Sequence, residues 1–413
     1  MRDQAPQPGA RPAESFAARF GDGVVEALFP LVPLFYLVRL LSPAELGLLG
    51  LALAGTALWQ HLIALRAESV VGGADGPDSA TAARDRAVVT ALGVCGLAAL
   101  AVACSVLAIA LPAFALVFAL APALAAIRFV DSLELAGVVD EGCIARHRMI
   151  SMLGNLIGLV LTVGLISGLE LGWPGRILAL VLAEGGVVIV RAILLARRGR
   201  GHSVAWEPSR ARALIGAAAP TLAAALLLFV LDHCNRLVAL GTLTMTDVGA
   251  FVVAYRVGSS VVVINRSLAF ALAPRVKTCL RPDRLGALRR LHIAYGLVIL
   301  ALGAAIAVAF MTAGPWILGP VFAPVAPIVA IVTLGYGFQG VQRVGGIMRT
   351  RFGLPAPSPW HLNAGALLGL AVGLVLAPTL GAPGVALGSA LGLATVAVLS
   401  AVTAHRALPR YVR

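Results

Sequence analysis

The sequence predicts an all-α polytopic membrane protein with about 12 transmembrane helices, arranged as two parallel six-helix repeats. The first observation is composition: 60% of the 413 residues are hydrophobic and 12% are charged, about half the charged share of a soluble domain. The second is a series of apolar runs of about 20 residues, the length of helix that crosses about 30 Å of hydrocarbon. The third is a pair of sequence motifs that recur half a chain apart. Runs such as 87–110 are apolar on every face, which excludes the alternating strands of a β-barrel.

The apolar runs, separated by turn residues and charges, define the expected spans in order. They lie at 17–38, 46–66, 87–110, 112–134, 149–169, 175–196, 213–238, 247–273, 291–313, 322–342, 361–379 and 383–404. An even number of spans places both termini on one side of the membrane. The expected organisation is a disordered cytoplasmic tail (1–16), an N-terminal lobe (17–200), a cytoplasmic linker (201–212), a C-terminal lobe (213–404) and a second tail (405–413).

Basic residues fix the expected orientation. If both termini are cytoplasmic, 25 of the 32 arginines and lysines fall in cytoplasmic segments, and only Arg39 and Arg176 fall in outer loops. Positive charge retained on the cytoplasmic side explains this asymmetry and the net charge of +13, so no nucleic-acid partner is expected. The ratio of 31 arginines to one lysine is typical of a GC-rich bacterial genome. The expected location is therefore the bacterial inner membrane, with membrane lipids as surroundings.

Two motifs indicate an internal duplication. "LSPAELG" at 41–47 recurs as "LTMTDVG" at 243–249, and "GWPG" at 172–175 recurs as "GAPG" at 381–384. The offsets of 202 and 209 are close to half the chain length, and six helices per repeat insert both copies the same way up. Ser42 and Thr244 are suited to cap a helix, and Glu45 and Asp247 stand three residues later, where a carboxylate completes a capping box.

The chain resembles the multidrug/oligosaccharidyl-lipid/polysaccharide exporter superfamily, and within it the polysaccharide (O-antigen-type) flippase branch. The resemblance rests on "LLSPAELGLLGLALAG" after the first span and on "RLVALGTLTMTDVGAFVVAYRVGSSVVVI" in the second half. It implies two lobes around a V-shaped central cavity, lined largely by spans 1, 2, 7 and 8, and transport by alternating access.

Charged residues within the spans are the candidates for chemistry, because each costs a few kcal/mol unless it faces a cavity or a partner. Arg256 lies about 13 Å into its span and calls for an anion. Asp232 and Arg236 share one helix face. They form either a self-neutralising pair or, with Arg39 and Arg256, a basic substrate-binding patch in the cavity that Asp232 restrains.

Further candidates lie on three other spans. Tyr336, Gln339 and Arg343 form a polar stripe suited to a sugar-facing wall, although Arg343 also fits an interfacial anchor. Asp22 and Glu26 are like charges one turn apart, so they are candidates for ion coupling or gating, or are simply solvated. Two smaller expectations concern packing: Arg128 reaches the membrane surface, and Glu184 with Arg191 supplies polarity inside a lobe.

The sequence excludes the common enzyme classes. The single lysine, Lys277, has no glycine-rich loop before it, so no ATP-binding motif of the Walker type is present. Neither H-E-x-x-H nor G-x-S-x-G occurs, and the five cysteines form no C-x-x-C pair. We therefore expect no enzyme, no catalytic residue, no cofactor and no metal site.

The expected function is a flippase that moves a lipid-linked oligosaccharide of the prenyl diphosphate type to the outer leaflet. Arginines suit it because guanidinium binds phosphate in bidentate fashion. Its possible partners are a glycan polymerase or glycosyltransferases. The alternative is a proton- or sodium-coupled multidrug or cation antiporter, which requires carboxylates as the dominant charge of the cavity; Asp22, Glu26 and Asp232 keep it open.

Overall fold

The computed structural model describes residues 31–71, 80–136, 141–196, 205–279, 285–351 and 359–411. Within these ranges the chain is helical, and 11 helices are long and apolar enough to cross a membrane. These helices confirm the expected all-α polytopic fold. Of the expected first span, only the last part is described, as the short helix α2 (Leu31–Leu40). Asp22 and Glu26 lie outside the described residues.

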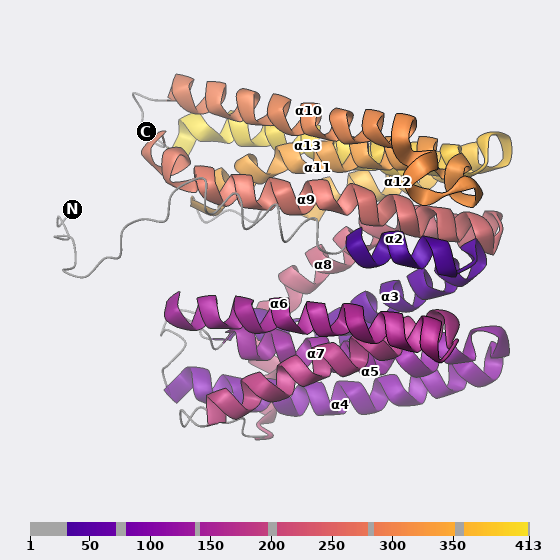
Figure 1. Ribbon diagram of the computed structural model, residues 1–413. Helices are drawn as coiled ribbons and strands as arrows, with labels where there is room; N and C mark the ends of the chain where they lie inside the picture. The colour runs from indigo at the N-terminus through magenta and orange to yellow at the C-terminus, as the bar shows by residue number, and fades with distance from the viewer. Residues whose placement is uncertain are drawn as a thin grey trace.

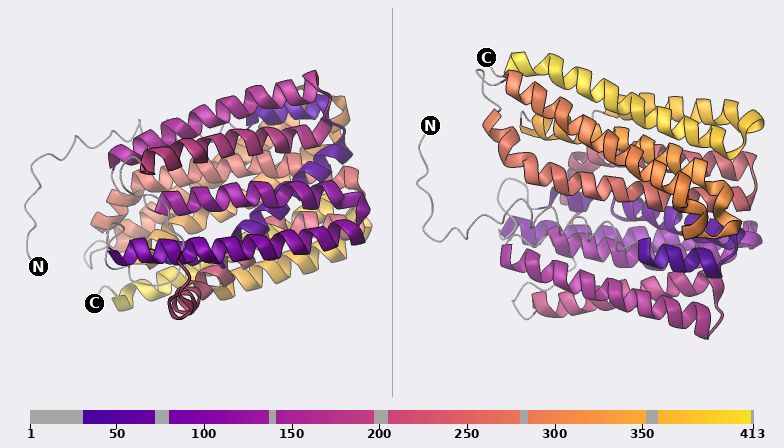
Figure 2. Two further views of the ribbon diagram at one scale, coloured as in Figure 1. Left: turned by 90° about the horizontal axis from the view of Figure 1, so that it is seen from below. Right: turned by 45° about the horizontal axis from the view of Figure 1, so that its top comes forward.

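The helices form two groups that run along a common axis (Figures 1 and 2). The N-terminal lobe contains α3 (Pro43–Ile63), η1 (Ala67–Val70), α4 (Ala80–Ala110), η2 (Pro112–Phe114), α5 (Ala115–Ala136), α6 (Glu141–Val163), the π-helical turn η3 (Gly164–Gly168) and α7 (Gly172–Ala196). The C-terminal lobe contains α9 (Met245–Cys279), α10 (Leu285–Leu318), η5 (Pro320–Val325), α11 (Ala326–Arg351), α12 (Pro359–Leu380) and α13 (Ala382–Tyr411). Helix α8 (Pro208–Thr242) runs between the two groups (Figure 1).

The duplicated heptapeptide begins equivalent helices, α3 and α9. At α3, the Glu45 carboxylate accepts hydrogen bonds from the backbone N–H of Ser42 (2.9 Å) and from its hydroxyl (2.8 Å). At α9, Asp247 accepts the same two bonds from Thr244, at 3.1 and 2.7 Å. Both helices start at the end of the molecule opposite the C-terminus of α13 (Figure 1). We call this the capped end and the opposite one the terminal end.

The second duplicated motif also adopts matching conformations. Gly172 and Gly381 open the two copies, and their φ angles are +58° and +60°. Backbone in this left-handed region is readily adopted by glycine, which has no β-carbon to clash with the carbonyl. The equivalent turns before α7 and α13 confirm the two parallel repeats.

Helix α8 packs against both lobes. Near its start, Ala211 and Leu214 join an apolar cluster of the N-terminal lobe that includes Val88. Near its end, Leu231 and Val238 belong to the large apolar core that includes the buried residues of the C-terminal lobe. The helix therefore runs from the N-terminal lobe at the terminal end to the C-terminal lobe towards the capped end, where α2, α3 and α9 also link the lobes.

Candidate functional site

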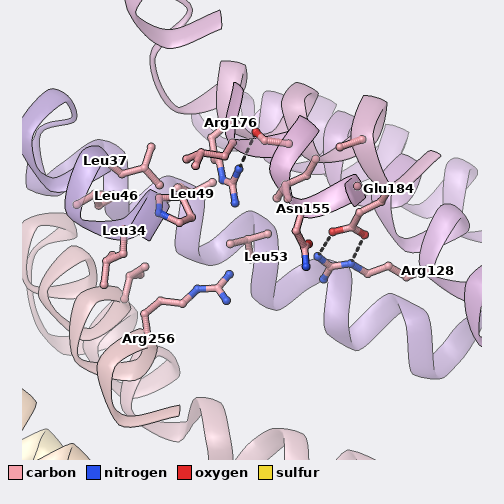
Figure 3. A pocket seen from close by; sticks show the side chains of 17 residues that line it. Leu34, Leu37, Leu46, Leu49, Leu53, Arg128, Asn155, Arg176, Glu184 and Arg256 are labelled. Atoms are coloured by element: carbon pink, nitrogen blue, oxygen red, sulfur yellow. Dashed lines mark hydrogen bonds and ion pairs between the residues drawn. The ribbon is translucent and has the colours of Figure 1, made fainter. Parts of the chain in front are cut away.

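A cavity of about 210 Å³ lies between the two lobes. Its apolar wall is formed by α2 and α3, including Leu34, Leu49 and Leu53. Its polar wall is formed by α5, α6 and α7 of the N-terminal lobe and by Arg256 of α9 (Figure 3). An apolar cavity with a few convergent polar groups is the usual form of a small-molecule or lipid site.

Arg128 and Glu184 form a bidentate ion pair in this wall. The Nε and Nη2 atoms of Arg128, on α5, donate to the two carboxylate oxygens of Glu184, on α7, both at 2.8 Å. Each side chain is 29% exposed. The expectation that Arg128 reaches the membrane surface is therefore wrong, because a carboxylate on the neighbouring helix holds it at the cavity.

Arg176 enters the cavity from α7. Its Nη1 donates to the hydroxyl of Thr162 at 2.5 Å and lies 3.5 Å from the carbonyl oxygen of Gly158, both on α6. These partners are neutral, so the positive charge of Arg176 is not balanced by an ion pair. Arg176 is therefore not an outer-loop residue, as the count of basic residues took it to be. It lies within the helix that the apolar run 175–196 predicts, since α7 begins at Gly172.

Arg256 lies across the cavity from Arg176. Its side chain extends from α9 towards the N-terminal lobe (Figure 3). Among the described residues, its guanidinium group makes no hydrogen bond or ion pair, and the neighbouring cavity residues Leu34, Leu53 and Val252 are apolar. The depth predicted from the sequence is consistent with this position at the cavity.

The described lining therefore has three arginines and one glutamate. Because Glu184 is already paired with Arg128, the charges of Arg176 and Arg256 remain available to a bound group. A guanidinium group is a fork of donors that matches carboxylate and phosphate oxygens. The cavity is suited to an anion that is held from both lobes at once.

Four other predicted site residues meet within the C-terminal lobe instead. Arg236 is 3% exposed, its Cζ lies 4.0 Å from the ring centroid of Tyr255, and its Nη1 lies 2.9 Å from Nδ1 of His233. Asp232 accepts a hydrogen bond from Nε2 of Gln339 at 3.2 Å. The ring of Tyr336 packs edge-on against Tyr255, with centroids 5.8 Å apart. None of the four lines the cavity.

The remaining predicted residues are dispersed. Arg39 is exposed in the last turn of α2 and does not line the cavity. Arg343 lies on α11, but its side chain is outside the described part of the structure. The structure thus does not bring Arg39, Arg236 and Arg256 into one patch at this cavity, and the substrate and coupling roles of these residues stay predictions.

Sequence reasoning missed Arg128, Asn155, Arg176 and Glu184 as cavity residues. The sequence does contain an indication for one pair. Arg128 and Glu184 are opposite charges within two apolar spans, and such charges tend to form ion pairs. Glu184 and Arg191 were expected together to supply polarity inside a lobe. Arg191 does so, because it bonds to Asp131 and Ser151 within the N-terminal lobe, whereas Glu184 lines the cavity.

No protein-family model matches the chain, and no curated protein matches it. Solved structures do share its fold. A multidrug resistance MATE family transporter of the MOP superfamily, in an inward-facing conformation, aligns with a TM-score of 0.72 at 15% identity, over 96% of this chain and 99% of that one. A mutant of the Vibrio cholerae MATE transporter VcmN gives 0.57 at 16%, over 96% and 97%. MATE in complex with MaL6 gives 0.59 at 14%, over 96% and 92%. These matches show the fold over 96% of the chain.

Proposed function

We propose that this chain is a membrane exporter that works by alternating access and carries an amphipathic anion in the cavity between its lobes. The fold supports transport, because it is shared over 96% of the chain with an inward-facing multidrug transporter. The observation that carries the proposal is the placement of Arg176 and Arg256. They face one cavity from opposite lobes, and the lining carboxylate Glu184 is occupied by Arg128.

An anion in this position would interact with both lobes. Charge-assisted hydrogen bonds to guanidinium groups are stronger than neutral ones, and the low-dielectric surroundings strengthen them further. The apolar wall of α2 and α3 would take the lipophilic part of the cargo. A group bound across the two lobes favours the conformation in which both arginines reach it, which is how a ligand biases a two-state equilibrium.

Of the functions expected from the sequence, multidrug export receives more support from the comparisons than the glycan flippase. The structures with this fold are a multidrug resistance transporter and MATE transporters. The charge of the cavity argues against a cation as cargo, because the described lining offers no unpaired carboxylate. Export of anionic drug-like compounds is therefore our first candidate.

Flipping of a prenyl diphosphate-linked oligosaccharide is the second candidate. A diphosphate carries two negatively charged groups, and two arginines with unpaired charge suit it. In either case we propose a bacterial inner membrane as the location. The distribution of basic residues supports a capped end that faces outward and cytoplasmic termini.

The proposal is tested by transport into liposomes that contain the purified protein. An anionic amphipathic dye, a cationic dye and a prenyl diphosphate-linked glycan are supplied separately, with and without proton or sodium gradients. We expect Arg256→Ala to slow movement of the anionic cargo at least about tenfold, because it removes hydrogen bonds to a charged group. Arg39→Ala is the matched control and should stay within about twofold, since Arg39 lies outside the cavity.

The three cargoes separate the candidates. Transport of the glycan but not the dyes identifies the flippase. Gradient-driven transport of the cationic dye, unaffected by Arg256→Ala, would overturn the proposal in favour of the cation antiporter.

A further inference from the structure

The duplicated heptapeptides contain a glycine whose role the capping boxes do not explain. Gly47 follows Glu45 by two residues on α3, and Gly249 follows Asp247 by two residues on α9. Both glycines are buried, and α3 and α9 pack against each other near the capped end. Two equivalent positions of the repeat thus lie in the contact between the lobes.

The contact is reciprocal and is made by backbone. A β-carbon added to Gly249 would lie 1.9 Å from the carbonyl oxygen of Pro43, and one added to Gly47 would lie 2.6 Å from that of Met245. Each glycine therefore rests on the first turn of the opposite helix. One turn further along α3, a β-carbon at Gly50 would lie 2.0 Å from Cγ2 of Val252. Gly47 and Gly50 of α3 pack against α9, and Gly249 of α9 packs against α3. We call these three positions together the glycine contact.

Electrostatics makes such an approach costly unless the helix ends are neutralised. The N-terminus of each helix carries about half a positive charge, so two parallel N-termini side by side repel each other. Glu45 and Asp247 place a carboxylate on each of the two ends through their capping boxes. The repeated motif thus combines a neutralised helix end with the absence of a side chain at the place where the two ends meet.

We propose that the glycine contact is the closure of the capped end. It holds the lobes together there while the cavity faces the opposite side, and it separates when the cavity opens at the capped end. This inference rests on the proposed function, because it assigns the contact to one of the two states of alternating access. If the contact never separates, the same glycines are only packing residues. The experiment below distinguishes a permanent contact from one that opens.

The opening is measured by distances between spin labels on the two lobes. Leu169 and Leu380 are exposed residues just before the turns into α7 and α13, at the capped end of each lobe. They are replaced by cysteine in a background in which the five native cysteines are changed to alanine, and the labelled protein is studied in lipid nanodiscs. The distance distribution then reports the closed and open populations of the capped end.

Gly249→Ala is the main variant. Its methyl group can be accommodated only if the distance to the Pro43 oxygen grows from 1.9 Å to the ordinary contact distance of at least 3.4 Å. We expect the ratio of closed to open molecules to fall about tenfold or more. Gly241→Ala is the matched control on the same end, because nothing lies within 4 Å of a β-carbon there, and its distribution should equal that of the parent protein.

Two additional variants keep the test decisive if Gly249→Ala does not fold. Gly47→Ala should shift the distribution in the same direction and less far, because its contact is 2.6 Å. Gly50→Cys with Val252→Cys should form a disulfide, since the β-carbons would lie 3.2 Å apart, slightly under the usual range of about 3.5–4.5 Å. The cross-link is formed first, and thioether-linked spin labels, which reduction does not remove, are then attached at 169 and 380. The cross-link should remove the open population, and reduction should restore it.

An unchanged distance distribution in Gly47→Ala and Gly249→Ala, relative to Gly241→Ala, would overturn the closure. So would an open population that persists in the cross-linked protein. These readouts use no cargo, so they are independent of the proposed function. If the liposomes move no anion while the distributions shift as expected, the proposed cargo is wrong and the closure stands.

Discussion

The Arg128–Glu184 ion pair determines how much positive charge the cavity can offer, and its energy is measurable. A double-mutant cycle with Arg128→Gln, Glu184→Gln and both together isolates the interaction. The pair has two charge-assisted hydrogen bonds of 2.8 Å. Bonds to charged groups contribute about 1.5–3 kcal/mol each. Because both side chains are 29% exposed, solvent screening reduces the coupling, and we expect about 2 kcal/mol for the pair.

The expected losses of unfolding free energy depend on which charge each variant leaves in the protein without its partner. Each single variant leaves one buried partner without its counter-charge and should cost about 2 kcal/mol, whereas the double variant should cost about 2 kcal/mol and not twice that amount. The assay is equilibrium unfolding of the detergent-solubilised protein in sodium dodecyl sulfate, followed by tryptophan fluorescence. Arg84 and Glu207 provide the control cycle: they are 62% and 31% exposed, so their coupling should be below about 1 kcal/mol.

A coupling below about 0.5 kcal/mol for Arg128 and Glu184 would refute the reasoning. It would mean that water screens the pair, as it screens an exposed one. Glu184 would then be free to bind a cation, and the argument for an anionic cargo would lose its premise.

Two further predictions concern the repeats and the terminal end. Ser42→Ala and Thr244→Ala should each lower the free energy of unfolding by about 1 kcal/mol, because each removes an equivalent cap; a difference above about 1 kcal/mol in the same titration would contradict the equivalence. Burial raises the pKa of Glu68, which lies in η1 outside the spans, although Nη1 of Arg66 is 3.2 Å away. Its ionisation therefore opposes folding, and stability should fall as pH rises from the ordinary glutamate pKa through the raised one. Glu68→Gln should be the more stable protein at neutral pH and should lose this advantage in acid, and an advantage that does not change with pH would refute the assignment.

The fold could be predicted because its determinants are local. Span length follows from apolar runs, and the capping boxes at Ser42 and Thr244 are complete within four residues. Helix ends were less predictable. Helix α8 begins at Pro208, before the expected start at 213, because Arg210 and Arg212 continue the helix beyond its apolar part. Hydropathy detects the apolar section of a helix, whereas caps and packing determine where the helix ends.

The site was less predictable because its polar contacts join different helices. Arg256 could be proposed from its depth alone, which is a property of one span. The bond between Arg128 and Glu184 joins α5 to α7, and the cluster around Tyr255 joins α8, α9 and α11. The spacing of residues in the sequence shows which of them share a helix face, but it does not show which other helix packs against that face. Asp232 and Arg236 were thus correctly seen to share a helix face, but the sequence could not show that this face meets Tyr255 and Gln339, away from the cavity.

Arg176 links the orientation of the chain to its chemistry. Counted as a residue of an outer loop, it weakens the asymmetry of basic residues; within α7 it lines the cavity and no longer belongs to that count. Arg39 is then the one remaining basic residue assigned to the outer side. The connections at the capped end, from 41 to 42, 111 to 114, 164 to 171, 243 to 244, 319 to 325 and at 381, contain no arginine or lysine. The same correction therefore strengthens the case for an outward-facing capped end and adds the second unbalanced charge on which the proposed anion site depends.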